Sequence, residues 1–98
     1  MTIIDEQENK TMTLHIAGRI DTITAPELEK KIAALSPEVT DLILDMKEVV
    51  YISSAGLRVL LSAQKKMSRV GSMKLSGVCS AVMEVLEMTG FADILVIE

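Results

Sequence analysis

Two adjacent serines, Ser53 and Ser54, stand where an apolar segment gives way to a long helical pattern. A serine at a helix start can cap the helix, because its hydroxyl accepts a hydrogen bond from a backbone N–H of the first turn. It can also be a regulated site. We interpret Ser54 as the N-cap residue, with Ser53 as the alternative one position earlier. Both uses fit Ser54 equally well.

The other reactive side chains are few and scattered along the chain. His15 is the only histidine, and we expect it to be solvated on the polar face of an edge strand. A triad of Ser54, His15 and Asp45 would have to converge from a sheet edge and a strand end, and we do not expect it. Cys79 is interpreted as a partly buried structural thiol. We therefore expect no catalytic residue, no metal site and no cofactor.

The composition describes one domain, residues 1–98, with an aliphatic core, because 49% of the residues are hydrophobic and only 2% are aromatic. The net charge of −4 argues against a nucleic-acid partner, which requires a basic surface. A single cysteine excludes an internal disulfide and fits a reducing compartment. No apolar run near the N-terminus is long enough for a signal peptide or a membrane span. We expect a cytoplasmic protein that binds neither nucleic acid nor a membrane.

The first half of the chain predicts a β-hairpin followed by a helix. Residues 2–8 form a possible first strand, and Asn9 and Lys10 supply a turn. Alternation then indicates a half-buried second strand. Thr24 opens a helix, with Glu27 three residues later completing a capping box. The apolar residues of the second strand are Met12, Leu14 and Ile16, and those of the helix are Leu28, Ile32 and Leu35.

The central segment, residues 40–69, predicts a strand, a connector and a second helix. Residues 42–44 are aliphatic without alternation, which suits a parallel strand covered on both faces, and Asp45 closes it. After a brief connector, apolar residues recur at helical spacing, with a polar stripe opposite. The apolar stripe is Leu57, Leu60, Leu61, Gln64 and Met67, and the polar stripe is Arg58, Ser62, Lys65 and Arg69.

The last third predicts a strand at 73–78, a helix at about 80–89 ended by Gly90, and a buried strand at 94–97. The expected order is therefore ββαβαβαβ. Strands joined by helices run parallel. The expected fold class is α/β, with a mixed, mostly parallel β-sheet and helices packed against it.

Three segments resemble the motifs of one known family. Residues 50–60, with the sequence VYISSAGLRVL, resemble the signature of anti-sigma factor antagonists, which are STAS domain proteins. Gly18 to Asp21 resembles the Gly-x-Leu/Ile-Asp turn of that family. Residues 85–91 resemble the end of its third helix. The three segments occur in the family's order and extend over nearly the whole chain.

The resemblance implies a partner-switching protein that is not an enzyme. In this family, the unphosphorylated antagonist binds an anti-sigma factor with serine kinase activity and thereby releases the sigma factor. Phosphorylation of the serine that matches Ser54 ends the association, and a metal-dependent serine phosphatase restores it. Ser53 stands where the family usually has aspartate, and it is the alternative acceptor. The other function considered is a STAS scaffold or transporter-accessory module that binds proteins without phosphorylation.

The expected partner surface combines the Asp21 turn with the start and the exposed stripe of the second helix. Four of the ten Lys and Arg residues fall between Arg58 and Arg69 in an otherwise acidic chain. Complementary charge would chiefly speed association with an acidic partner. The expected partner-binding residues are Asp21, Thr22, Ser53, Ser54, Ala55, Gly56, Arg58, Ser62 and Lys65.

Overall fold

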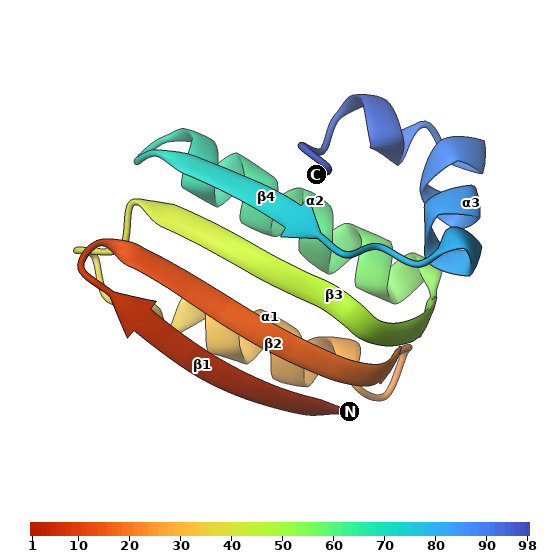
Figure 1. Ribbon diagram of the computed structural model, residues 1–98, viewed down its shortest axis with the longest axis horizontal. Helices are drawn as coiled ribbons and strands as arrows, with labels where there is room; N and C mark the ends of the chain where they lie inside the picture. Colours follow the sequence, from red (N-terminus) through yellow and green to blue (C-terminus); the bar gives the residue numbers. More distant parts are fainter.

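The computed structural model describes all residues, 1–98, and has one four-stranded sheet with helices against it (Figure 1). The strand order is β1-β2-β3-β4, with β1 antiparallel to β2 and the other pairs parallel. This confirms the predicted fold class. The elements are β1 (Thr2–Glu8), β2 (Thr11–Ile20), α1 (Ala25–Ala33), β3 (Asp41–Ile52), α2 (Ser54–Ser68), β4 (Ser72–Ser76), α3 (Ser80–Met88) and the short 3-10 helix η1 (Phe91–Asp93).

The predicted hairpin is confirmed. Asn9, at the turn between β1 and β2, has φ of 58°, a left-handed conformation that asparagine tolerates better than most residues. Along β2, Met12, Leu14 and Ile16 are buried, so the period-two pattern predicted the core face correctly. Residues 18–20 also belong to β2, although the sequence suggested that the strand ended before them. Figure 1 shows β1 at one edge of the sheet.

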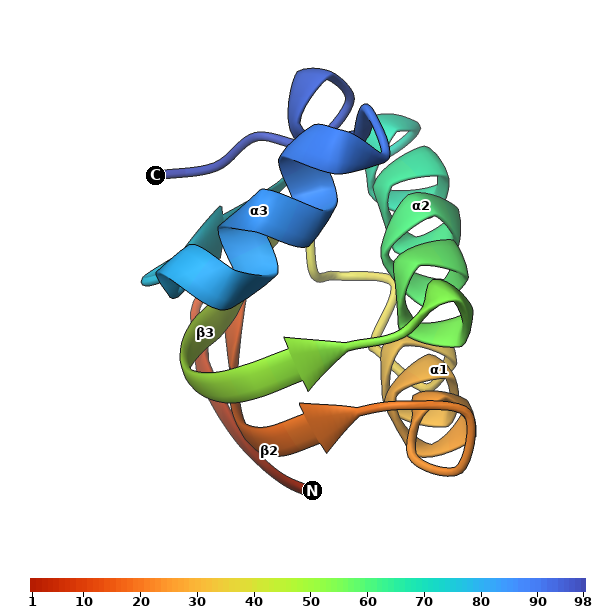
Figure 2. The ribbon, with the colours of Figure 1, turned by 90° about the vertical axis from the view of Figure 1, so that its right-hand side faces the viewer.

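The helices α1 and α2 lie side by side on one face of the sheet, and its other face is largely open (Figure 2). Ile43 on β3 is therefore only half-buried, and the prediction that this strand is covered on both faces was wrong. The predicted connector after Asp45 was also wrong, because β3 continues to Ile52. Two register shifts in the β2–β3 ladder absorb the extra residues of β3, so the backbone pairing reaches the ends of both strands.

The second helix shows the predicted two-sided pattern. Leu57, Leu60 and Met67 are buried against the sheet, and the whole predicted polar stripe is exposed. Leu61 and Gln64, which the predicted apolar stripe included, are only half-buried. Val59 and Ala63 are also buried, because they face α1 across the seam between the helices.

None of the helices has both the length and the apolar character that a membrane span requires.

The C-terminal segment departs from the prediction. Helix α3 is confirmed, and Gly90 follows it with φ of 80°. The predicted buried strand at 94–97 is reduced to a single parallel bridge between Leu75 and Ile97. Only Leu95 in this segment is buried, while Ile94 and Val96 are 52% and 54% exposed. The helix η1 occupies residues 91–93, directly before this segment.

Candidate functional site

The Asp21 turn and the serine pair meet at one end of the sheet. Strands β2 and β3 are parallel and end in register at Ile20 and Ile52, and each then turns into a helix (Figure 2). The backbone N–H of Ser53 donates to the Ile20 carbonyl oxygen at 2.8 Å. The carboxyl ends of parallel strands are a common position for binding sites in α/β proteins.

Ser53, not Ser54, caps helix α2. The Ser53 backbone is extended, with φ of −97° and ψ of 176°, and its hydroxyl accepts a long hydrogen bond of 3.4 Å from the Gly56 N–H. Ser54 is the first residue of the helix, and its side chain is exposed. The preferred assignment of Ser54 as the cap was therefore wrong by one position. The two hydroxyls have different environments, one engaged with the helix backbone and the other facing solvent.

Gly56 allows the start of α2 to approach the two strand ends. A Cβ at this position would lie 2.7 Å from the side chains of both Ile20 and Ile52 and 3.2 Å from the Ile20 carbonyl oxygen. Gly56 itself is buried. This close approach explains why a glycine stands two residues after Ser54.

The Asp21 turn is held by a local hydrogen-bond network. Asp21 Oδ1 accepts from the backbone N–H groups of Ile23 and Thr24, each at 3.0 Å. The Thr24 hydroxyl accepts from the Asp21 N–H at 2.8 Å and donates to the Arg19 carbonyl oxygen at 2.7 Å. The hydrogen bond from the Thr24 N–H contributes most to holding the pKa of the Asp21 carboxyl below its usual range.

This network corrects the predicted capping box at Thr24 and Glu27. The Thr24 side chain makes no cap hydrogen bond to α1, because its hydroxyl is already bonded within the turn. In a capping box Glu27 would accept a hydrogen bond from the Thr24 N–H, but here the Asp21 carboxylate accepts it. Asp21 thus shapes the turn, and Thr22 and Ile23 lie exposed upon it.

Three exposed residues close in sequence to the strand ends Ile20 and Ile52 were missed by the sequence analysis: Arg19, Ile23 and Tyr51. Ile23 is 85% exposed although it is aliphatic, and Tyr51 is 40% exposed. The Arg19 guanidinium lies 4.1 Å from the centre of the Tyr51 ring and 3.8 Å from Asp21 Oδ2. An aliphatic residue inside a polar turn and the only tyrosine, two positions before Ser53, were the available signals.

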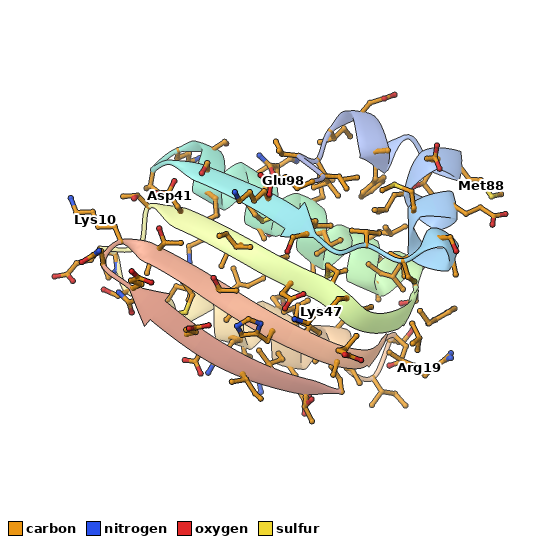
Figure 3. The ribbon with its side chains drawn as sticks, viewed as in Figure 1. Lys10, Arg19, Asp41, Lys47, Met88 and Glu98 are labelled. Carbon is orange, nitrogen blue, oxygen red and sulfur yellow. The ribbon has the colours of Figure 1, made fainter.

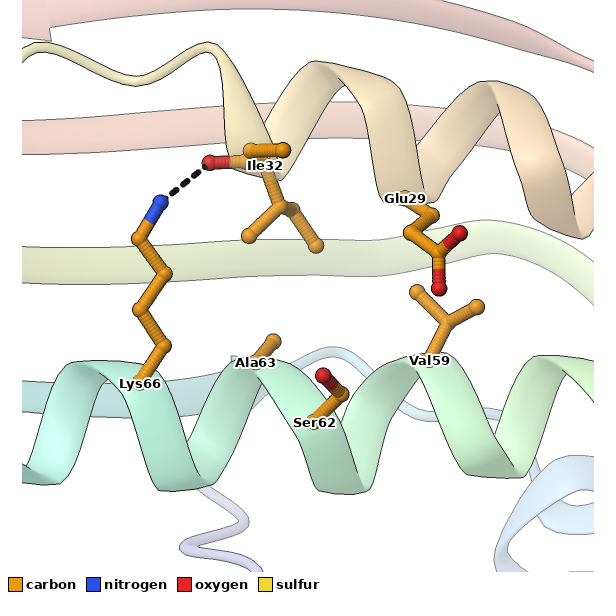
Figure 4. A pocket seen from close by; sticks show the side chains of 7 residues that line it. Glu29, Ile32, Val59, Ser62, Ala63 and Lys66 are labelled. Carbon is orange, nitrogen blue, oxygen red and sulfur yellow. Dashed lines mark hydrogen bonds between the residues drawn. The ribbon is translucent and has the colours of Figure 1, made fainter.

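Shallow hollows follow the seam between α1 and α2. One, of about 80 Å³, lies beside the Lys66 ammonium group, which donates to the Ile32 carbonyl oxygen at 2.9 Å (Figure 4). A second, of about 260 Å³, brings together Thr22, Ala55 and Arg58. Ser62 lines the first hollow, while Lys65 is exposed and lines neither. The remaining lining residues are Glu29, Ala33, Val59 and Ala63 for the first, and Ala25, Pro26, Glu29 and Val59 for the second.

The considered triad is not assembled. His15 lies on β2, an inner strand of the sheet, and its Nδ1 is 2.7 Å from Asp45 Oδ2, so the expectation of a solvated ring on an edge strand was wrong. At about 3.3 Å per residue, the stretch of β3 from Asp45 to its last residue, Ile52, spans roughly 23 Å, so Ser54, which begins α2, lies far from this pair. Cys79 Sγ lies 3.4 Å from the Val49 carbonyl oxygen, and no group of three His, Cys, Asp or Glu side chains is arranged to hold a metal ion.

Comparisons with known proteins match this chain over nearly its whole length. The STAS domain model matches residues 2–98. The chain is 32% identical over 94 residues to the anti-sigma-B factor antagonist of Bacillus subtilis, covering 94% of this chain and 86% of that protein.

Solved structures show the same fold. The anti-sigma factor antagonist from Mycobacterium paratuberculosis matches with a TM-score of 0.88 at 24% identity, over 98% of this chain and 83% of that one. Bacillus SpoIIAA matches with a TM-score of 0.77 both in its unphosphorylated form, at 18% identity, and in its phosphorylated form, at 17% identity. The alignments cover 99% of this chain and 87% and 91% of those chains. The chain belongs to the STAS domain family, among its anti-sigma factor antagonists.

Proposed function

We propose that this protein binds an anti-sigma factor with serine kinase activity through the sheet end formed by the Asp21 turn and the start of α2. Phosphorylation of Ser54 by that kinase ends the association, and a metal-dependent serine phosphatase restores it. The observation that carries the proposal is the difference between the two hydroxyls. Ser53 is engaged in the helix cap, whereas Ser54 is exposed and free of the cap, as a kinase acceptor must be.

Exposed apolar and aromatic residues near the strand ends in the sequence support a protein interface. Ile23 lies in the Asp21 turn and Tyr51 precedes the last residue of β3, and exposed side chains of these kinds commonly anchor protein partners. The cations Arg58 and Lys65 extend the surface along α2, which carries no acid in its first turn. This combination fits a partner with an apolar contact point and acidic residues beside it.

The position of Ser54 also suggests how phosphate would act. A phosphoserine adds about −1.5 to −2 charges. At the first position of α2 the free backbone N–H groups and the helix dipole favour that charge, so the domain has no reason to unfold. The SpoIIAA comparison supports this, since this fold matches both forms of that protein equally well. Binding would be lost at the partner's surface, where the dianion meets bulk, desolvation and like charge.

The test is to incubate the purified protein with its anti-sigma factor and ATP and to measure the intact mass. The proposal predicts the addition of one phosphoryl group, and separation of the complex as the modified form accumulates. A stable complex that takes up no phosphate would contradict it and would favour a scaffold or transporter-accessory module. An otherwise identical incubation without ATP serves as the control.

A further inference from the structure

The only histidine joins three strands across the open face of the sheet. His15 on β2 has its Nδ1 atom 2.7 Å from Asp45 Oδ2 on β3 and its Nε2 atom 2.9 Å from Glu6 Oε1 on β1. Figure 3 shows this face, with Lys47 labelled on β3. This cluster is remote from the serine site and has no part in the proposed function.

Proton counting assigns a charge to the ring. An ionised carboxylate only accepts hydrogen bonds, so each ring nitrogen of His15 must donate one. Neutral imidazole has a single N–H, and both bonds therefore require the imidazolium form. The ring lies between the two carboxylates, which contact opposite nitrogens, so one metal ion could not replace the proton by binding all three groups.

The charges around the ring favour this form. Glu6 contributes most and Asp45 next to raising the pKa of His15 above its ordinary value. Lys47 is the other cation of the cluster, with its ammonium group 3.4 Å from Asp45 Oδ2. From β4, the register partner of Asp45 is the uncharged Ser76, and the helices α1 and α2 lie on the opposite face of the sheet.

The two carboxylates would respond differently to loss of the proton. The Asp45 side chain is only 11% exposed, and it also accepts a hydrogen bond of 3.2 Å from the backbone N–H of Lys47. The Glu6 side chain is 70% exposed. Burial works to raise the pKa of Asp45, but the hydrogen bonds from His15 and Lys47 outweigh it and hold that pKa down. A neutral ring would therefore keep its proton towards the less solvated Asp45. Its Nε2 lone pair would then face Glu6, which would turn to solvent.

Glu6 matters because β1 has few other side-chain attachments. Every residue of this edge strand is exposed except the half-buried Ile3. Besides the backbone ladder to β2, an ion pair of 3.3 Å between Asp5 and Lys31 links β1 to α1. Loss of the Glu6 contact would weaken the attachment of β1 and leave the β2–β3 contact in place.

We propose that His15 is a proton-operated tie between β1 and the sheet, closed while the ring carries two protons and open once it loses one. The pKa of His15 is raised in the folded state. The tie therefore contributes its full stability at pH values below the unfolded-state pKa of about 6.5, and this contribution is lost as pH rises through the folded-state pKa. The edge strand thus becomes less protected as pH rises through the folded-state pKa of the His15 ring.

NMR titration of the His15 ring tests this proposal, with Glu6→Gln as the variant and Glu8→Gln as its control. Glu8 is an exposed acid on the same strand and the same face, opposite Thr11. The wild-type ring should titrate above about 6.5. Glu6→Gln should lower the titration midpoint clearly more than Glu8→Gln does. A midpoint at the ordinary value, or equal shifts in both variants, would overturn the proposal.

Hydrogen exchange supplies the second measurement on the same samples. In the wild type, protection factors of the β1 amides should fall across the His15 titration while those of the β3 amides stay constant. In Glu6→Gln the β1 protection should be lower and independent of that titration. If the protection factors of the wild-type β1 amides did not change across the His15 titration, the proposal would be contradicted even with a raised titration midpoint.

Discussion

The hydrogen bond of 2.8 Å from the Ser53 N–H to the Ile20 carbonyl oxygen joins the two strand ends on which the candidate site is built. One residue beyond Ile20, Asp21 begins the turn that exposes Thr22 and Ile23. One residue beyond Ser53, Ser54 begins α2. A change at either strand end would therefore move both parts of the proposed interface together.

The identity of the acceptor is tested by replacing each serine with alanine. Ser53→Ala should still take up one phosphoryl group from the kinase, because Ser54 keeps its exposed hydroxyl. Its loss of the cap should lower the free energy of unfolding by about 0.5–1 kcal/mol, the lower part of the usual range, since the cap bond is long. Ser54→Ala should take up none. Loss of labelling in Ser53→Ala alone would reverse the assignment.

Charge reversal on α2 tests the basic part of the interface. Arg58→Glu and Lys65→Glu should each slow association with the anti-sigma factor and weaken its dependence on salt, because exposed charges act mainly on encounter. The matched control is Lys10→Glu in the hairpin turn, at the other end of the sheet from Arg19 (Figure 3). Rapid-mixing kinetics at two salt concentrations give the measurement. Equal rates for all three variants would mean that the partner binds elsewhere.

Gly56→Ala tests the close approach of α2 to the strand ends. The added methyl would clash with Ile20 and Ile52, and overpacking of this kind costs about 1–3 kcal/mol of stability. Urea denaturation of Gly56→Ala and of Ser62→Ala, an exposed change on the same helix, provides the comparison. Ser62→Ala should stay within about 0.5 kcal/mol of the wild type. Equal stability of the wild type and both variants would show that the strand ends can move enough to accommodate the added methyl group.

The Asp21 turn should be sensitive to acid. Because the folded-state pKa of Asp21 is lowered, its carboxylate contributes stability above the unfolded value of about 3.9 and loses it as pH falls through the folded value. The difference in unfolding free energy between the wild type and Asp21→Asn should therefore be constant near neutral pH and shrink below about pH 4. Glu87→Gln, an exposed change on α3, is the control. A difference that does not vary with pH would contradict the role given to this carboxylate.

The sequence predicted the elements better than the contacts at their ends. Period-two alternation located β2, and helical spacing located α2, because burial of one face leaves a repeating pattern. The capping box at Thr24 failed because a carboxylate three residues earlier, Asp21, reaches the same turn of backbone. The N-cap of α2 is Ser53 and not the predicted Ser54, a difference of one residue that depends on backbone angles that residue types do not determine.

The remaining differences came from long-range pairing. Residues 46–52 look like a connector in isolation, but the last four residues of β2 pair with Glu48, Val49, Tyr51 and Ile52. Residues 94–97 look like a buried strand, yet they form only one bridge to β4, from Ile97 to Leu75, and only Leu95 lies in the core. The contact between His15 and Asp45 likewise depends on strand register, which one sequence does not specify.

The affinity of the anti-sigma factor for the protein with phosphoserine incorporated at position 54 tests the central claim most directly. Unmodified protein and a Ser54→Ala variant should bind tightly. The phosphoserine form should bind roughly 10⁴-fold more weakly, the differential needed to move a complex from almost fully bound to almost fully released. Its thermal melting should match that of the unmodified protein, because the helix start accommodates the dianion. Tight binding by the phosphoserine form would contradict the account.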